Sequence, residues 1–217
     1  VSLVTLIDPS SPVAEQYRTI RTNIQFASSA DKPIKTIVVT SSGPGEGKST
    51  TAANLAVVFA NSGQRVLLVD ADMRKPTVYK SFHLSNAIGL STVLSTIQSI
   101  SEAAQKTEIN NLSILTSGPK PPNPSELLGS TRMDQFLVEA RNLYDIIIFD
   151  MPPVVAVTDA QIMASKADGT ILVVRKNVSR KESLTKAKGL LHMVQAKVLG
   201  VVYNCAENAK DQGYYYN

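Results

Sequence analysis

Residues 42–50 constrain the fold of this chain more than any other segment. Their sequence is Ser-Gly-Pro-Gly-Glu-Gly-Lys-Ser-Thr; an apolar run at 36–40 precedes them, and a largely apolar run at 51–60 follows. A buried strand, a glycine-rich turn and a helix in this order form the setting of a phosphate-binding loop, because the turn lets backbone N–H groups surround an anion at a helix N-terminus. The segment therefore predicts a strand–loop–helix unit that binds phosphate.

Two side chains of this loop have predicted roles: Lys48 reaches the outer phosphates, and the Ser49 hydroxyl binds Mg²⁺. The strict pattern has glycine at the position of Ser42, so the match is to the Gly-Lys-Ser core at 47–49. The alternative is an ordinary glycine-rich turn, which the flanking strand and helix disfavour. The residues expected to bind nucleotide are Gly43, Pro44, Gly45, Glu46, Gly47, Lys48, Ser49 and Thr50.

Composition narrows the class of protein. A chain of 217 residues, 43% of them hydrophobic and 18% charged, fits one soluble globular domain. No apolar run reaches the length of a membrane span, and we expect no signal peptide. One cysteine and two histidines cannot form a disulfide framework or a His/Cys metal site, so any metal is expected to have oxygen ligands. The net charge of +4 does not indicate nucleic-acid binding.

Apolar runs alternate with helical patterns along the chain, which predicts an α/β fold: a doubly wound, mostly parallel sheet with helices on both faces, as in P-loop NTPases. The strands are expected near 36–41, 66–70, 112–116, 145–150, 170–175 and 198–203. The helices are expected near 48–61, 90–105, 130–143, 157–166 and 179–194. In the proline-rich segment 119–124 we expect Asn123 to cap a short helix, with a capping box closed by Glu126.

Two of the predicted strands end in aspartate. Asp70 and Asp150 each follow four apolar residues, and Asp72 comes two positions after the first of them. An aspartate at a strand end beside a phosphate loop typically holds Mg²⁺, so we expect Ser49 and these three carboxylates to form the metal site. One of them, Asp70 or Asp72, is expected to take a proton from an incoming hydroxyl. A helix cap or turn is the alternative role for any one of them.

Arg74 follows in the same acidic segment, Asp70-Ala71-Asp72-Met73-Arg74. Its predicted role is to neutralise the charge of a phosphoryl group in transfer. A surface arginine paired with a carboxylate is an equally favoured interpretation. The sequence alone does not separate the two.

Together these motifs resemble the bacterial tyrosine kinases of the phosphate-loop type, the cytoplasmic kinases of capsule and exopolysaccharide systems. The loop at 44–49, the acidic segment at 70–74, the strand and loop at 146–153 and the segment 121–128 carry the resemblance, which covers nearly the whole chain. Partition and division-site ATPases are related but place a second lysine where this chain has Gly43. The resemblance implies an ATP- and Mg²⁺-dependent protein-tyrosine kinase that phosphorylates itself and other proteins. It also implies that Asn204 contacts the adenine base; a turn-forming role is the alternative for this residue.

The resemblance also assigns roles to both ends of the chain. Within a predicted N-terminal helix at about 12–30, Glu15, Arg18 and Arg21 match the family's self-association motif, and a repeated head-to-tail contact closes a ring. An internal ion pair on a solvated face is the alternative. At the other end, in an expected flexible tail at about 206–217, lie the predicted autophosphorylation sites Tyr214, Tyr215 and Tyr216.

The family further implies a membrane-embedded activator that supplies a cytoplasmic segment, and hence a cytoplasmic location at the inner face of the cell membrane. Two other functions stay open from the sequence. One is a switch ATPase of the partition type, which Gly43 and the tyrosine tail disfavour. The other is a nucleotide-gated scaffold that binds ATP without transferring phosphoryl groups.

Overall fold

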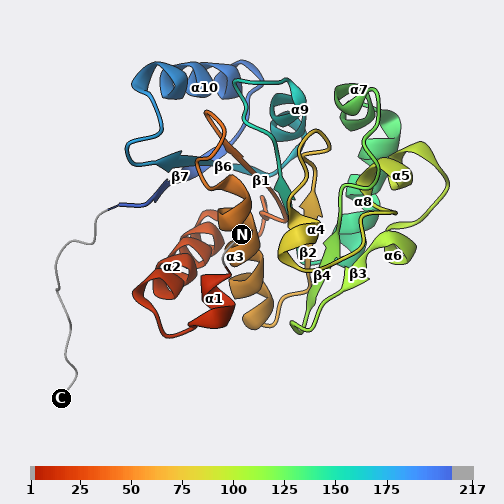
Figure 1. The fold of residues 1–217 in the computed structure, drawn as a ribbon, viewed down its shortest axis with the longest axis horizontal. Helices are drawn as coiled ribbons and strands as arrows, with labels where there is room; N and C mark the ends of the chain where they lie inside the picture. Colours follow the sequence, from red (N-terminus) through yellow and green to blue (C-terminus); the bar gives the residue numbers. More distant parts are fainter. Residues whose placement is uncertain (1–2, 207–217) are drawn as a thin grey trace.

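A seven-stranded sheet forms the centre of the computed structural model, which describes residues 3–206 (Figure 1). The strand order is β3-β4-β2-β5-β1-β6-β7, and all neighbours are parallel except the antiparallel pair β3 and β4. This confirms the predicted doubly wound, mostly parallel sheet. The strands are β1 (Thr36–Ser41), β2 (Val66–Asp70), β3 (Gln105–Lys106), β4 (Leu112–Leu115), β5 (Ile146–Asp150), β6 (Gly169–Arg175) and β7 (Val198–Asn204).

Helices cover both faces of this sheet (Figure 1). One apolar core joins it to α2 and α3, and a second joins it to helices that include α8, α9 and α10. The helices are α1 (Val4–Ile7), α2 (Pro12–Ala27), α3 (Lys48–Asn61), α4 (Val78–Ser81), α5 (Leu90–Ser95), α6 (Ile100–Ala103), α7 (Pro124–Leu128), α8 (Thr131–Leu143), α9 (Asp159–Lys166) and α10 (Lys181–Met193). No helix within residues 3–206 has the length and apolarity to cross a membrane.

The central strands show why the apolar runs lack polar alternation. In β5, Ile147 and Phe149 contribute to the core with α8 and α9, whereas Ile146 and Ile148 contribute to the core with α3. Successive side chains of a strand point to opposite faces, and both faces are covered, so every position must be apolar. Packing of the core therefore does not explain the polar residues at the ends of these strands, which indicates a functional role for them.

One predicted helix was wrong. The segment 90–105 forms two short helices, α5 and α6, and the chain then enters the edge strand β3. The break lies at Thr96, whose backbone is extended, and α6 restarts at Ser99, whose hydroxyl accepts the N–H of Glu102 while the Glu102 carboxylate accepts the N–H of Ser99. This Ser-x-x-Glu capping box was visible in the sequence and marks the second helix start.

The start of α7 was predicted correctly, but its capping box was wrong. Asn123 precedes the helix and Pro124 occupies its first position, yet the Asn123 side chain accepts no backbone N–H. Its amide instead donates to Glu126 Oε2 at 2.9 Å. The proline at the first position already lacks one of the N–H groups that a cap would satisfy.

Candidate functional site

The loop between β1 and α3 has the backbone that its glycines predict. Gly45 and Gly47 both adopt positive φ, at 75° and 92°, which disfavours other residues. A Cβ atom on Gly47 would also lie 2.4 Å from Asn204 Nδ2, so a larger residue here would have to displace the Asn204 amide. Helix α3 begins at the next residue, Lys48, and its N-terminus supplies N–H groups and a favourable dipole for an anion held by the loop.

Lys48 lies between two carboxylates. Its Nζ atom is 3.1 Å from Asp72 Oδ2 and 3.5 Å from Asp150 Oδ1, and it donates to Ser49 Oγ at 3.3 Å. Burial by itself lowers the pKa of Lys48, but the charges of Asp150 and Asp72 outweigh it and raise the pKa. The lysine is therefore held in its charged form at the base of the loop.

Asp150 is fully buried at the end of β5, and its Oδ2 atom has no hydrogen-bond partner among residues 3–206. Its side chain also forms a hydrogen bond with Ser49, and burial raises the pKa of Asp150. A buried carboxylate oxygen without a partner is costly unless a cation or donor satisfies it. Oxygen atoms from a hydroxyl and a carboxylate are what Mg²⁺ prefers, so these two residues fit the predicted metal.

Asp70 ends β2 directly opposite Asp150 in the strand register. Its Oδ2 atom accepts the N–H groups of Thr77 at 3.0 Å and Val78 at 2.9 Å, and its Oδ1 atom accepts that of Asp72 at 3.3 Å. Burial, with repulsion from Asp150, raises the pKa of Asp70 to about 7. Asp70 therefore organises the segment after β2 and stays close to its protonation midpoint at neutral pH.

The predicted cluster of three carboxylates does not form a metal cage. Within residues 3–206 no group of three or more His, Cys, Asp and Glu side chains could hold a metal ion. Asp70 is occupied by backbone N–H groups, and Asp72 pairs with Lys48 and accepts the N–H of Lys75 at 3.0 Å. A magnesium ion here would therefore take most of its ligands from phosphate oxygens and water, as is usual for this ion.

Arg74 pairs with residues that the sequence analysis missed. Its Nε and Nη2 atoms each lie 2.9 Å from an oxygen of Asp159, and Nη2 lies 3.1 Å from Ser125 Oγ. Asp159 is fully buried at the start of α9, and Ser125 belongs to α7. The structure thus shows Arg74 paired with a carboxylate, the alternative raised from the sequence.

Asn204 supports the loop from the end of β7. Its Nδ2 atom donates to the carbonyl oxygen of Glu46 at 3.1 Å and to Thr51 Oγ1 at 3.3 Å. The predicted adenine contact would have to coexist with these bonds. In the structure Asn204 stabilises the loop and the first turn of α3.

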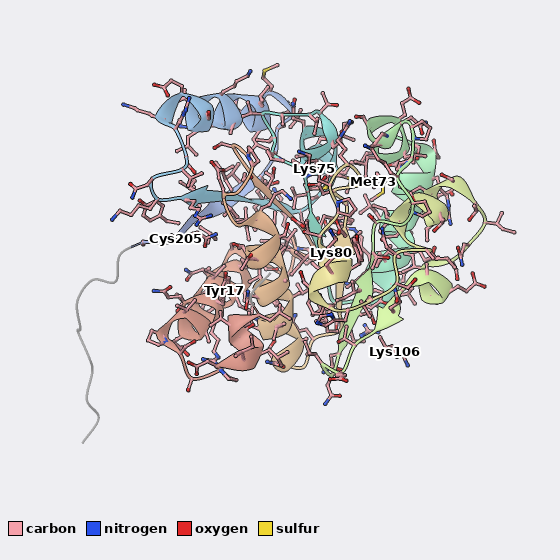
Figure 2. All side chains as sticks on the ribbon, viewed as in Figure 1. Tyr17, Met73, Lys75, Lys80, Lys106 and Cys205 are labelled. Carbon is pink, nitrogen blue, oxygen red and sulfur yellow. The ribbon has the colours of Figure 1, made fainter. Side chains whose placement is uncertain are left out.

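The three residues of the predicted association motif lie on α2 and contact their own chain. Arg18 Nη1 pairs with Glu15 Oε2 at 2.6 Å, and Arg21 Nη1 donates to the carbonyl oxygen of Val58 in α3 at 3.0 Å. Tyr17, labelled on α2 in Figure 2, is buried, and its side chain forms a hydrogen bond with Thr51. Helix α2 is therefore joined to the helix that carries Lys48. Tyr214, Tyr215 and Tyr216 lie outside the described residues.

Comparisons with known proteins agree with this geometry. A family model described as an AAA domain matches residues 34–198. The chain is 50% identical over 216 residues to tyrosine-protein kinase YwqD of Bacillus subtilis (strain 168), covering 99% of this chain and 91% of that protein. It is 42% identical over 208 residues to the putative tyrosine-protein kinase CapB of Staphylococcus aureus, covering 96% and 91%.

Solved structures give the same result. The kinase domain of Escherichia coli tyrosine kinase ETK superimposes with a TM-score of 0.90 at 29% identity, covering 100% of this chain and 85% of that one. The chimerical protein CapA2B2 gives a TM-score of 0.88 at 43% identity, covering 93% and 88%. The septum site-determining protein MinD of Pyrococcus horikoshii, with Mg-ADP, gives 0.66 at 23% identity over 78% of this chain and 70% of that one, a likeness of fold alone.

Proposed function

This chain belongs to the bacterial tyrosine-protein kinases of the phosphate-loop type, and we propose that it transfers the γ-phosphoryl group of ATP to tyrosine, including Tyr214, Tyr215 and Tyr216 of its own tail. The observation that supports this most is Lys48 at the base of the loop, between Asp72 and Asp150. The residues that transfer and accept the phosphoryl group are proposals of ours. The likeness to MinD extends only to the fold. This chain has Gly43 at the position where the switch ATPases have a second lysine, so the kinase is the better supported function.

We propose a separate role for each group of residues in the site. We assign the phosphates to the backbone N–H groups of the loop and to Lys48, which exchanges its carboxylate partners for phosphate oxygens. Ser49 and Asp150 would hold Mg²⁺, which neutralises charge on the transferred group when bound. The tyrosine hydroxyl loses its proton to Asp70 or Asp72 as its oxygen bonds to phosphorus and ADP leaves. Arg74, fixed by Asp159, borders this site.

The test of this proposal is transfer between two inactivated chains. One chain carries Lys48→Met and keeps the tyrosine tail; the other keeps the site and carries phenylalanine at 214–216. Phenylalanine removes only the acceptor oxygen, so we expect the fold and ATP binding to be unchanged. Mixed with Mg-ATP and an activator, the pair should label the tail of the first chain, as read by mass spectrometry of phosphotyrosine.

Each chain alone is the control and should give no tail label. Label on the first chain supports transfer between subunits. No label in confirmed mixed oligomers, with label in the parent, means transfer within one subunit or another acceptor. A parent that never labels its tail, even with activator, contradicts the kinase proposal and favours a switch ATPase or a scaffold.

Self-association through α2 is part of the proposal. Glu15 and Arg18 have side-chain exposures of 67% and 35%, whereas Arg21 is engaged with α3. Arg18 also donates to the carbonyl oxygen of Pro9. The pair can exchange these internal contacts for one with a neighbouring subunit, giving a directional charge-assisted bond. We further propose that a membrane-embedded activator places the ring at the inner face of the cell membrane, where it regulates exopolysaccharide or capsule production.

The double variant Glu15→Ala and Arg18→Ala is expected to shift the oligomer to monomer in light scattering while leaving ATP affinity unchanged. Arg21 stays in place because its loss would also remove a bond to α3. The matched control is Glu182→Ala with Lys186→Ala, which removes one acid and one base from the exposed surface of α10. If the parent is monomeric at every concentration, with ATP and without it, this part of the proposal fails.

A further inference from the structure

We propose that Glu46 and Ser179 form a clamp that holds the phosphate loop in its nucleotide-binding shape, so that both side chains are positioning residues for ATP. The inference deepens the proposed function but rests on it only through nucleotide binding. Glu46 lies inside the loop sequence, yet its carboxylate points back into the protein: the residue is 2% exposed. Ser179 belongs to the connection between β6 and α10 and has no role in the loop pattern.

The Glu46 carboxylate accepts four hydrogen bonds from Ser42, Gly43 and Ser179. Its Oε2 atom accepts the N–H of Ser42 at 2.8 Å and that of Gly43 at 3.1 Å. Its Oε1 atom accepts the hydroxyls of Ser42 at 2.7 Å and Ser179 at 2.6 Å. The side chain therefore closes the loop onto its own beginning. A negative charge beside ATP opposes phosphate binding, so its presence calls for a compensating structural role.

Two strand ends anchor this closed loop from outside. The Ser179 hydroxyl accepts the N–H of Arg175 at 2.8 Å, and Arg175 Nη1 donates to the carbonyl oxygen of Gly45 at 2.9 Å. From β7, Asn204 Nδ2 donates to the carbonyl oxygen of Glu46. The loop is thus tied at successive residues to β6 and β7, the strands at one edge of the sheet. A loop fixed in this way loses less conformational freedom when it binds phosphate.

The donors predict which substitution the clamp tolerates. Two backbone N–H groups of the loop can only donate, so they need an oxygen acceptor, which both glutamate and glutamine provide. The two hydroxyls can turn and accept from a glutamine amide instead of donating to a carboxylate. Glutamine can therefore keep all four bonds without the charge, whereas alanine leaves the two N–H groups unpaired.

The experiment measures the dissociation constant of ADP with Mg²⁺ by calorimetry, and KM and kcat with ATP. Glu46→Ala is expected to bind ADP about 10-fold or more weakly, and Ser179→Ala about 3-fold to 10-fold more weakly. Glu46→Gln should recover most of the affinity lost in the alanine variant. KM for ATP should rise in parallel while kcat at saturation changes little. The matched control is Ser165→Ala, an exposed serine whose hydroxyl donates to the carbonyl oxygen of Ile162 in its own helix α9.

Each outcome decides between roles. If Glu46→Ala binds ADP as tightly as the parent, or if glutamine is as weak as alanine, the clamp is wrong. A fall in kcat with unchanged KM also overturns it, because it indicates a direct part in phosphoryl transfer. Should Glu46→Ala fail to fold, unchanged ADP affinity in Ser179→Ala overturns the clamp. A parent that binds ADP without labelling tyrosine contradicts the kinase and leaves these ADP affinities as the test of the clamp.

Discussion

Replacement of Lys48 by methionine is expected to abolish phosphoryl transfer and to weaken nucleotide binding. Lys48 is the only cationic side chain in the loop 42–50, so no other group of the loop can neutralise the outer phosphates. Loss of one preorganised electrostatic contact typically lowers kcat by about 10²–10³-fold. The loss here should be larger, since the lysine also balances Asp72 and Asp150. The measurement is tail phosphotyrosine by mass spectrometry in a pure sample with Mg-ATP.

This substitution also needs a control for folding. Removing Lys48 leaves the buried charge of Asp150 without its cation, which destabilises a protein when one partner of a buried pair is lost. Thermal melting must therefore show that the variant is folded under the assay conditions. Lys106→Met is the matched control, because Lys106 is an exposed lysine on β3 (Figure 2). Full autophosphorylation by the folded Lys48→Met variant contradicts the site assignment.

The parts of the fold that the sequence predicted well have strong local signals. Helix α3 was predicted with both ends correct, since a left-handed glycine precedes it and Gly63 follows it with φ of 89°. The strands that end in Asp70 and Asp150 were recognised because burial on both faces leaves no polar position before the aspartate. The prediction of a single helix over 90–105 was wrong because Ser99 caps the start of a second helix inside this segment. That cap outweighs the helix propensity of the residues around it.

The sequence predicted which residues form the site, but it did not predict where their side chains point. The loop pattern fixes where backbone N–H groups go, but nothing local tells that the Glu46 carboxylate turns back toward Ser179, 133 positions away. Arg74 likewise meets Asp159 across 85 positions, and each residue alone reads as a common surface or cap residue. Such pairs form only when the sheet order brings distant loops together, which depends on packing of the whole chain.

Asp70→Asn is expected to lower phosphoryl transfer far more than nucleotide affinity and, unusually, to stabilise the metal-free protein. If Asp70 is the general base, kcat should fall by about 10²–10⁴-fold, because an amide has similar shape but accepts no proton. Asn can still accept the N–H groups of Thr77 and Val78 through its oxygen. ADP affinity should therefore change little, and the comparison variant Asp72→Asn tests the other candidate base.

The stability effect follows from the raised pKa. Because the pKa of Asp70 rises from 3.8 to about 7 on folding, the native state binds more protons than the unfolded state between these values. The unfolding free energy contributed by this group is therefore highest below about pH 4 and falls as pH rises through about 7. Asparagine removes that loss, which is at most about 4 kcal/mol for a rise of about three pKa units at 1.36 kcal/mol each. It also gives up the bond from the Asp72 N–H to Oδ1, so at pH 8 without metal we expect a net gain of about 1–3 kcal/mol.

Urea unfolding of parent and Asp70→Asn in EDTA at pH 5 and pH 8 measures this gain, which should be larger at pH 8. The pH dependence of kcat then separates the two candidate bases. If Asp70 takes the proton, residual activity of Asp72→Asn should keep an ascending limb near the pKa of Asp70, and Asp70→Asn should lose that limb. Equal stability of parent and Asp70→Asn at both pH values contradicts the raised pKa, and near-normal turnover in both variants places the base on another residue.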